Sequence, residues 1–289
     1  MPFPSCSAPS SCSESEVAPL IDYEICTLYS GSSGNATLVR SPKATILIDA
    51  GKSARALCRA LASVGASPAD LDAVFITHEH SDHISALPVL THKYPVPIHI
   101  LYKSALIFRG SNDRALCECL QIELPGYTAH VGDMTVTSFP TPHDSADACG
   151  YRIDIRDENE EYVSVGIATD IGHVTDALRD GLCGCRSVVL ESNHDPDMLQ
   201  NGPYPADLKR RIRSPRGHLS NPDAALFATE LYENGTRDFL LAHLSEQNNH
   251  PDLVMDAFVS ALGTNDVNIR VASPDSVTWL VRGKAGAVC

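Results

Sequence analysis

The stretch FITHEHSDHISAL, Phe75–Leu87, places three histidines and an aspartate within six residues. It follows the apolar run AVFI, which lacks the alternation of a half-buried strand and so predicts a strand covered on both faces. Imidazole and carboxylate groups are ligands for zinc, manganese and iron(II). The spacing H-x-H-x-D-H therefore predicts that one loop, at the end of a buried strand, supplies four ligands to two neighbouring metal ions.

The same arrangement recurs along the chain. Further apolar or alternating runs end at His143, Asp170, Glu191 and His243. Each of these four is a weak indication by itself, because a loop histidine or a capping aspartate is common. Since open α/β sheets place their sites beyond the carboxyl ends of strands, their shared position favours one site and an α/β fold.

Composition favours one folded domain. The 289 residues are 43% hydrophobic and 20% charged, which is ordinary for a globular protein, and no apolar run reaches the roughly 18 residues of a membrane span. Residues 1–20 are rich in Ser and Pro and predict a disordered tail, with the folded domain spanning 21–289. This beginning lacks the features of a secretory or transit signal, so we expect a cytoplasmic protein.

The charge is unevenly distributed. The net charge of −14 argues against a polyanionic substrate, yet residues 209–216, KRRIRSPR, hold five of the 22 basic residues and no acidic one. We expect Lys209, Arg210, Arg211 and Arg213 to form a cationic ridge along which a phosphate backbone passes. A solvated helix face with charge pairs is the alternative.

The ligand pattern resembles the metallo-β-lactamase superfamily, whose fold is an αββα four-layer sandwich with a one- or two-metal site at its edge. The resemblance implies one metal held by His78, His80 and His143, and a second held by Asp82, His83 and His243. Asp170 would bridge the two metals. All seven positions are present in order.

Longer motifs narrow the resemblance. The chain is similar to the YycJ (WalJ) family in the following blocks: LYSGSSGNATLV, ATDIGHV, ESNHDPDML, GPYPADLKRRI, RGHLSN and AHLSEQNN. Members of that family degrade DNA from 5′ ends. The resemblance therefore implies a binuclear phosphodiesterase, a 5′-3′ exonuclease on double-stranded DNA.

Two divalent ions can activate a bridging water as hydroxide, which Asp82 and Asp170 would orient. His218 is not needed as a ligand, and its motif resembles that of a histidine in ribonuclease Z that protonates the leaving oxygen. We therefore expect His218 to be the general acid and Glu191 to support it. A histidine hydrogen-bonded at a helix start is the alternative.

Three further residues are candidate substrate contacts. Ser33 and Asn35 lie in the glycine-rich segment SGSSGN, whose backbone N–H groups could approach a substrate, although a tight turn explains the segment almost as well. His194 could contact substrate, support a ligand, or be a turn residue.

Two other functions remain open at this point. One is a small-molecule metallohydrolase acting on a thioester, lactone or lactam, which the acidic composition favours. The other is a metal-stabilised regulatory scaffold without turnover. The ligand types admit zinc or manganese, and the sequence leaves the oligomeric state open.

Overall fold

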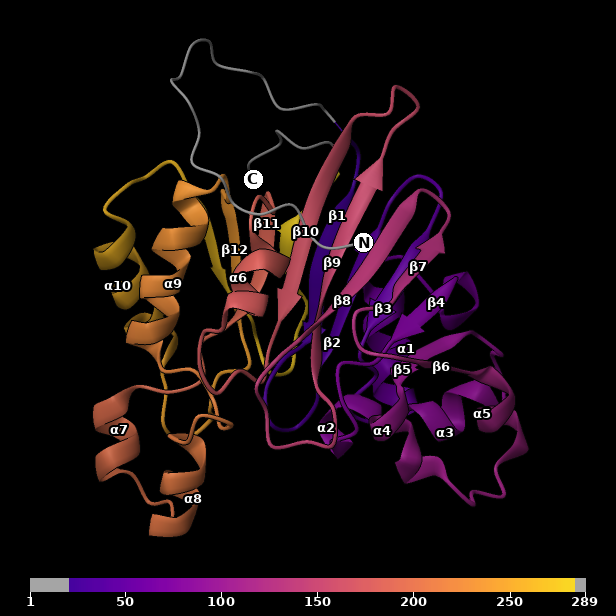
Figure 1. The fold of residues 1–289 in the computed structure, drawn as a ribbon, viewed down its shortest axis with the longest axis horizontal. Helices are drawn as coiled ribbons and strands as arrows, with labels where there is room; N and C mark the ends of the chain where they lie inside the picture. Colours follow the sequence, from indigo (N-terminus) through magenta and orange to yellow (C-terminus); the bar gives the residue numbers. More distant parts are fainter. Residues whose placement is uncertain (1–20, 284–289) are drawn as a thin grey trace.

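The computed structural model describes residues 21–283, which form two stacked mixed sheets between layers of helices (Figure 1). The tail expected over residues 1–20 lies outside the described residues. The strand order is β14-β1-β2-β3-β4-β5-β6 in the first sheet and β13-β12-β11-β10-β9-β8-β7 in the second. The chain thus has the αββα four-layer arrangement that the sequence predicts.

The strands of the first sheet are β1 (Glu24–Tyr29), β2 (Ala36–Arg40), β3 (Thr45–Ile48), β4 (Ala73–Phe75), β5 (Ile98–Leu101), β6 (Leu120–Glu123) and β14 (Thr278–Val281). Those of the second are β7 (Thr128–Val131), β8 (Met134–Pro140), β9 (Cys149–Arg156), β10 (Tyr162–Ala168), β11 (Ser187–Glu191), β12 (Asp238–Ala242) and β13 (Asn268–Val271). The α-helices are α1 (Ala54–Ser63), α2 (Ser81–Ile84), α3 (Leu87–Thr91), α4 (Tyr102–Ala105), α5 (Arg114–Cys119), α6 (Asp176–Leu182), α7 (Pro196–Asn201), α8 (Ala206–Ile212), α9 (Asn221–Glu233) and α10 (Pro251–Leu262). Two short 3₁₀ helices, η1 (Pro68–Asp70) and η2 (Leu106–Phe108), complete the described elements.

Both sheets have the same internal pattern. In the first, β3, β4, β5 and β6 are parallel neighbours, while β14, β1, β2 and β3 pair antiparallel. In the second, β10, β11, β12 and β13 are parallel, and β7, β8, β9 and β10 are antiparallel. The parallel halves carry the strand ends that supply most of the candidate site.

The core has three layers of apolar side chains. One lies between the sheets and includes Ile46, Phe75, Tyr151 and Ile167. The other two lie where helices cover the outer faces of the sheets. Strand β4 is covered on both faces, so its sequence is apolar without alternation, as predicted.

A side-chain cap fixes the start of helix α9. The Ser220 hydroxyl accepts a hydrogen bond from Asp223 N at 3.3 Å, and Pro222 occupies the first turn, where its missing N–H costs little. This start fixes the position of the segment just before the helix, which contains His218.

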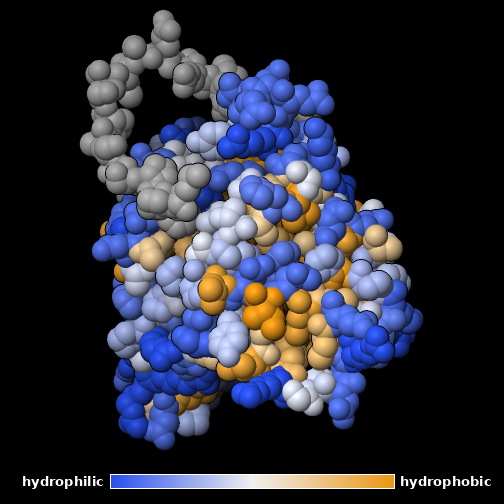
Figure 2. Space-filling model, turned by 45° about the vertical axis from the view of Figure 1, so that its right-hand side comes forward, coloured by the Kyte–Doolittle hydropathy of each residue, from blue (hydrophilic) through white to orange (hydrophobic). Residues whose placement is uncertain are grey.

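The edge strand β6 leaves part of the first sheet unpartnered. Ile122 and Leu124 are exposed there. Figure 2 is turned so that the right-hand side of Figure 1 comes forward, and it shows hydrophobic side chains gathered on that face.

Within residues 21–283, no helix has the length and apolar character needed to cross a membrane.

Candidate metal centre and cavity

The candidate site lies at the carboxyl ends of parallel strands from both sheets. Strands β3 and β4 end just before Asp49 and His78, and strands β10 and β12 end just before Asp170 and His243. Glu191 is the last residue of β11. Strands separated by many residues in the chain therefore deliver their side chains to one edge of the sandwich.

Close packing holds the loop after β4. Asn35 N donates to Asp82 O at 2.8 Å, and a Cβ on Gly51 would lie 1.9 Å from that same carbonyl oxygen. Gly51 is therefore required for the loop to approach the β3 exit. The His80 backbone caps the short helix α2, so His80 precedes the helical turn and Asp82 and His83 lie within it.

Three site residues adopt the left-handed region that non-glycine residues rarely enter. The φ angles are +62° for Asp49, +59° for Asp170 and +58° for His243, and each residue directly or closely follows its strand. Such conformations cost free energy and persist where the surroundings over-determine them. Here the sharp turn aims each side chain back across the sheet edge.

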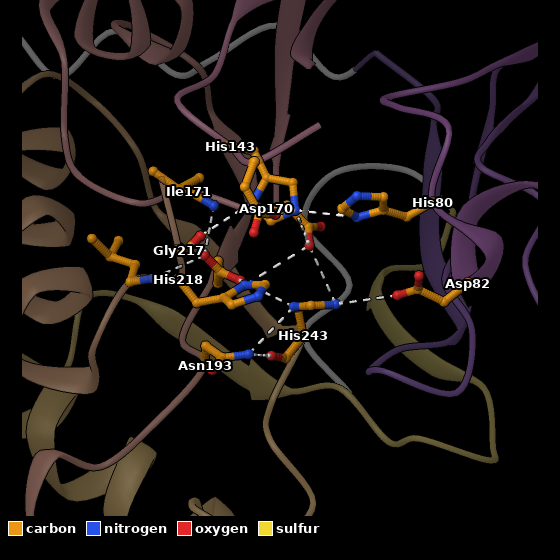
Figure 3. A network of polar contacts seen from close by, with 12 residues as sticks. His80, Asp82, His143, Asp170, Ile171, Asn193, Gly217, His218 and His243 are labelled. Carbon is orange, nitrogen blue, oxygen red and sulfur yellow. Dashed lines mark hydrogen bonds and ion pairs between the residues drawn. The ribbon is translucent and has the colours of Figure 1, made fainter. Parts of the chain in front are cut away.

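Seven side chains form what we call the ligand cluster: His78, His80, Asp82, His83, His143, Asp170 and His243. Potential ligand atoms of His78, His80 and His143 lie within 4.8 Å of one another, and so do those of Asp82, His83 and His243. Asp170 Oδ1 lies 3.7 Å from His143 Nε2 and 3.5 Å from His243 Nε2, between the two groups (Figure 3). The structure thus brings together all seven residues in the grouping that the resemblance implied.

Most of these histidines are oriented through their second ring nitrogen. Nδ1 of His83 donates to Asp49 at 2.8 Å, Nδ1 of His143 to Gly217 O at 3.2 Å, and Nδ1 of His243 to Glu191 at 3.0 Å. Thr77 Oγ1 lies 3.0 Å from Nδ1 of His78. Metal-binding histidines show this arrangement, because the outer partner fixes the ring and leaves Nε2 as the ligand atom.

Several buried polar atoms of the cluster have no hydrogen-bond partner within the described chain. They are Nε2 of His78, Nε2 of His243 and Oδ2 of Asp170. Burial would raise the pKa of the Asp170 carboxyl, but the neighbouring His243 and His83 outweigh it and hold that pKa well below its usual range. Unpartnered buried atoms of ligand type are costly unless something binds them, so this donor set fits divalent metal ions.

His218 and Glu191 form a pair beside the cluster. His218 Nδ1 donates to Glu191 Oε1 at 2.8 Å, while Glu191 Oε2 accepts from the N–H groups of Ile171 and Leu219 at 2.7 and 3.0 Å. Burial would raise the pKa of Glu191, but His218 and His243 lower it to about 2. A fixed, ionised Glu191 thus orients His218, whose Nε2 has no hydrogen-bond partner within residues 21–283.

A cavity of about 300 Å³ opens over the cluster. Its lining residues within the described chain are Ser32, His80, Asp82, His143, Asp170, Asn193, Tyr204, Leu208, Arg211, Ile212, His218, His243 and Ser245. Of the candidate substrate contacts in SGSSGN, Ser33 is exposed and outside this lining, and its neighbour Ser32 lies in it. Asn35 is buried beneath, where its amide donates to Asp82 at 3.3 Å, so it supports the cluster rather than facing the cavity.

The cationic ridge differs from the expectation. Lys209 Nζ donates to the carbonyls of Gln200 and Gly202 at 2.9 and 2.7 Å, Arg210 pairs with Asp207, and Arg211 pairs with Asp144. Of the four residues expected in the cationic ridge, which also include Arg213, Arg211 alone lines the cavity. The side chains of Lys209, Arg210 and Arg211 therefore bind groups of the protein itself, because carbonyl and carboxylate oxygens lie within their reach.

Arg213 is the exception in this block. It is exposed, and its side chain makes no hydrogen bond or ion pair within residues 21–283. It lies close enough to His194 to act on it electrostatically. Arg213 is therefore the residue of the predicted ridge that is free to meet a phosphate.

His194 lies behind the cavity rather than in its lining. It is 4% exposed, its Nδ1 has no partner within the described chain, and burial lowers the pKa of its imidazole to about 4. Its backbone bridges to Ser220 at the start of α9. Of the roles expected for His194, the supporting position fits its place in the structure.

Sequence reasoning missed four residues near the site. Asp49 holds both Thr77 and His83, Asn193 Nδ2 donates to His243 O at 2.8 Å, and Tyr204 and Asp144 lie at the cavity or its rim. Asp49 had a detectable pattern, because it follows the apolar run ATILI as His78 follows the next apolar run. The contacts of the other three depend on segments distant in the sequence.

Stacked mixed sheets with a histidine and aspartate cluster at their edge define the class: this chain is a metal-dependent hydrolase of the metallo-β-lactamase fold. The family profile of the metallo-beta-lactamase superfamily matches residues 29–113. The crystal structure of the metallo-beta-lactamase fold protein YhfI from Bacillus subtilis superposes with a TM-score of 0.67 at 18% identity, covering 90% of this chain and 99% of that one.

Sequence relatives identify the family within that class. The chain is 34% identical to exodeoxyribonuclease WalJ of Streptococcus pneumoniae over 268 residues, 90% of this chain and 98% of the relative. It is 35% identical to exodeoxyribonuclease YycJ of Bacillus anthracis over 226 residues, 78% of this chain and 84% of the relative. The chain belongs to the WalJ/YycJ family, as its motifs predict.

Proposed function

We propose that this protein is a binuclear metal-dependent phosphodiesterase that digests double-stranded DNA from 5′ ends. The observation that carries the proposal is the oriented His218–Glu191 pair beside a complete ligand cluster, facing one cavity. The names of the WalJ and YycJ relatives support DNA as substrate. The 5′ polarity comes from the family resemblance alone.

The ligand cluster would hold two divalent ions, zinc or manganese. His78, His80 and His143 fit one position, Asp82, His83 and His243 fit the other, and Asp170 lies between them. When bound, such ions supply Lewis acidity and a nucleophile at neutral pH. Asp82 and Asp170 would orient the nucleophile, and the outer partners Asp49 and Glu191 keep the histidine rings in place.

His218 supplies the proton in this proposal. Its Nδ1 is held by Glu191, so Nε2 faces the cavity and can protonate the leaving oxygen as the phosphodiester bond breaks. The buried Glu191 carboxylate holds the imidazole ring in the orientation that this transfer requires. The same Glu191 oxygen contacts His243, so one carboxylate positions both the proton donor and a metal ligand.

The test uses duplex DNA labelled at either its 5′ or its 3′ end, incubated with purified protein and manganese or zinc. We expect metal-dependent release of label from the 5′ end first, and none with Asp170→Asn. If the protein contains two metals and yet degrades neither DNA nor RNA, the nuclease proposal is wrong.

A small-molecule metallohydrolase is the second candidate. The observation that favours it is the pairing of Lys209, Arg210 and Arg211 with the protein's own groups, which weakens the case for a phosphate track. A thioester or lactone panel, assayed with the same metal-loaded protein, separates the two candidates. Turnover of these esters without DNA digestion would select the second.

A further inference from the structure

The cavity has two unlike sides. One side is polar and belongs to the ligand cluster, with His80, Asp82 and His218 in its lining. The other side comes from the α7–α8 arm, residues 196–212, which projects beyond the sheets at the lower left of Figure 1. The arm contributes Tyr204, Leu208, Arg211 and Ile212, a group that metal binding does not require.

The arm presents one face to the cavity. Residues 204, 208 and 212 recur at the spacing of successive turns on one side of a helix, with α8 spanning the last two. Tyr204 is half-buried, and its hydroxyl has no hydrogen-bond partner within the described residues. Tyr204 and Leu208 are half-buried and Ile212 is buried, so this side of the cavity is partly apolar and suits a flat, partly apolar group.

The backbone holds Tyr204 in place. Pro203 and Pro205 flank it and restrict the chain on both sides. Lys209 ties the start of α8 to the carbonyls of Gln200 and Gly202. A backbone restricted in this way loses little conformational freedom when a ligand stacks on the Tyr204 ring, which favours binding.

The size of the cavity limits what can enter. About 300 Å³ is at the lower end of the range for ligand pockets, a space suited to one nucleotide rather than to a base pair. A strand that reaches the ligand cluster must therefore enter with its last nucleotide separated from its partner. Its base then lies on the side opposite the phosphodiester groups.

The geometry points to Tyr204 as a stacking platform for the base of the terminal nucleotide, with Leu208 and Ile212 completing an apolar subsite. This inference rests on the proposed nuclease function and deepens it. The subsite makes the enzyme act on an unpaired strand end, one nucleotide at a time. It recognises the flat face of a base, so it accepts all four bases.

The test removes the base from the substrate and the ring from the protein. Wild-type protein digests two duplexes that differ only in the 5′-terminal nucleotide, which carries either a base or an abasic analogue. We expect kcat/KM to be about tenfold lower for the abasic end, in the range of base–aromatic stacking. Tyr204→Ala should lose about the same factor on the normal end and should no longer distinguish the two ends.

Two further variants complete the test. Tyr204→Phe keeps the ring and should behave as the wild type, whereas Tyr162→Ala removes an exposed tyrosine at the far end of β10 and should change nothing. Equal rates of the wild type on both ends, or discrimination retained in Tyr204→Ala, would overturn the inference while leaving the nuclease proposal intact. Failure of the wild type to digest either duplex would instead overturn the proposed function, and the stacking inference with it.

Discussion

The ligand cluster and the α7–α8 arm bound the same cavity but are built differently. The cluster consists mostly of buried polar side chains, several of them fixed by an outer partner such as Asp49 or Glu191. The arm is short, carries charge on its surface and offers the cavity apolar side chains. The difference assigns the reaction to the sheet edge and the choice of substrate to the arm, since one fold supports many substrates through variation of its loops.

The largest effect is expected at the centre of the cluster. Asp170→Asn keeps the size of the side chain but removes the charge that lies between the two ligand groups. We expect loss of bound metal and of measurable digestion, with metal content measured by plasma mass spectrometry. Asp176→Asn, at an exposed position in α6, is the matched control. Normal metal content and turnover in Asp170→Asn would remove Asp170 from the ligand set.

His218 tests whether proton transfer can be separated from metal binding. His218→Gln should lower kcat about 100- to 10,000-fold, the usual contribution of general acid–base catalysis. Its metal content should remain that of the wild type. Because His218, Glu191, Asp170 and His243 also lie close enough to share an ion, loss of a metal in this variant would instead make His218 a ligand.

The cluster was more predictable from sequence than the arm, for a physical reason. A ligand set must occupy strand ends and use only a few residue types, so the motif around His78 and the runs leading to Asp170 and His243 indicated one site on an α/β fold. The grouping of the ligands and the αββα arrangement came from the resemblance to the metallo-β-lactamase superfamily. By contrast, the pairing of β1 with β14 joins opposite ends of the chain, and no local pattern predicts it.

The cationic ridge predicted on the arm differs from the structure, because the sequence shows the positive charges but not the groups that pair with them. Arg211 contacts Asp144, and Lys209 contacts two carbonyls, so a run of positive residues did not make a positive track. Tyr204 lies in the block GPYPADLKRRI, but nothing in that block predicts that its side chain faces a cavity, because a tyrosine between two prolines is equally consistent with a surface turn. Which side chains face a cavity depends on tertiary packing.

Stability should distinguish the two regions less sharply than activity does. Leu190→Ala, in the buried strand β11, should lower the free energy of unfolding by about 2–5 kcal/mol, since it leaves a cavity in the core. Leu208→Ala, half-buried on the arm, should cost less than about 1 kcal/mol. Denaturant unfolding measures both, and a similar loss for the two variants would show that the arm is part of the core.

The smallest effect is expected at Arg213, whose side chain alone in the predicted ridge has no partner within residues 21–283. Arg213→Ala should weaken DNA binding equally for all sequences and reduce the slope of log affinity against log salt by about one unit, as loss of one phosphate contact does. Arg156→Ala, which removes an exposed, ion-paired arginine on β9, should leave the slope unchanged. An unchanged slope for Arg213→Ala would mean that the strand approaches along the apolar face of the arm without a phosphate contact there, and that stacking rather than charge guides it into the cavity.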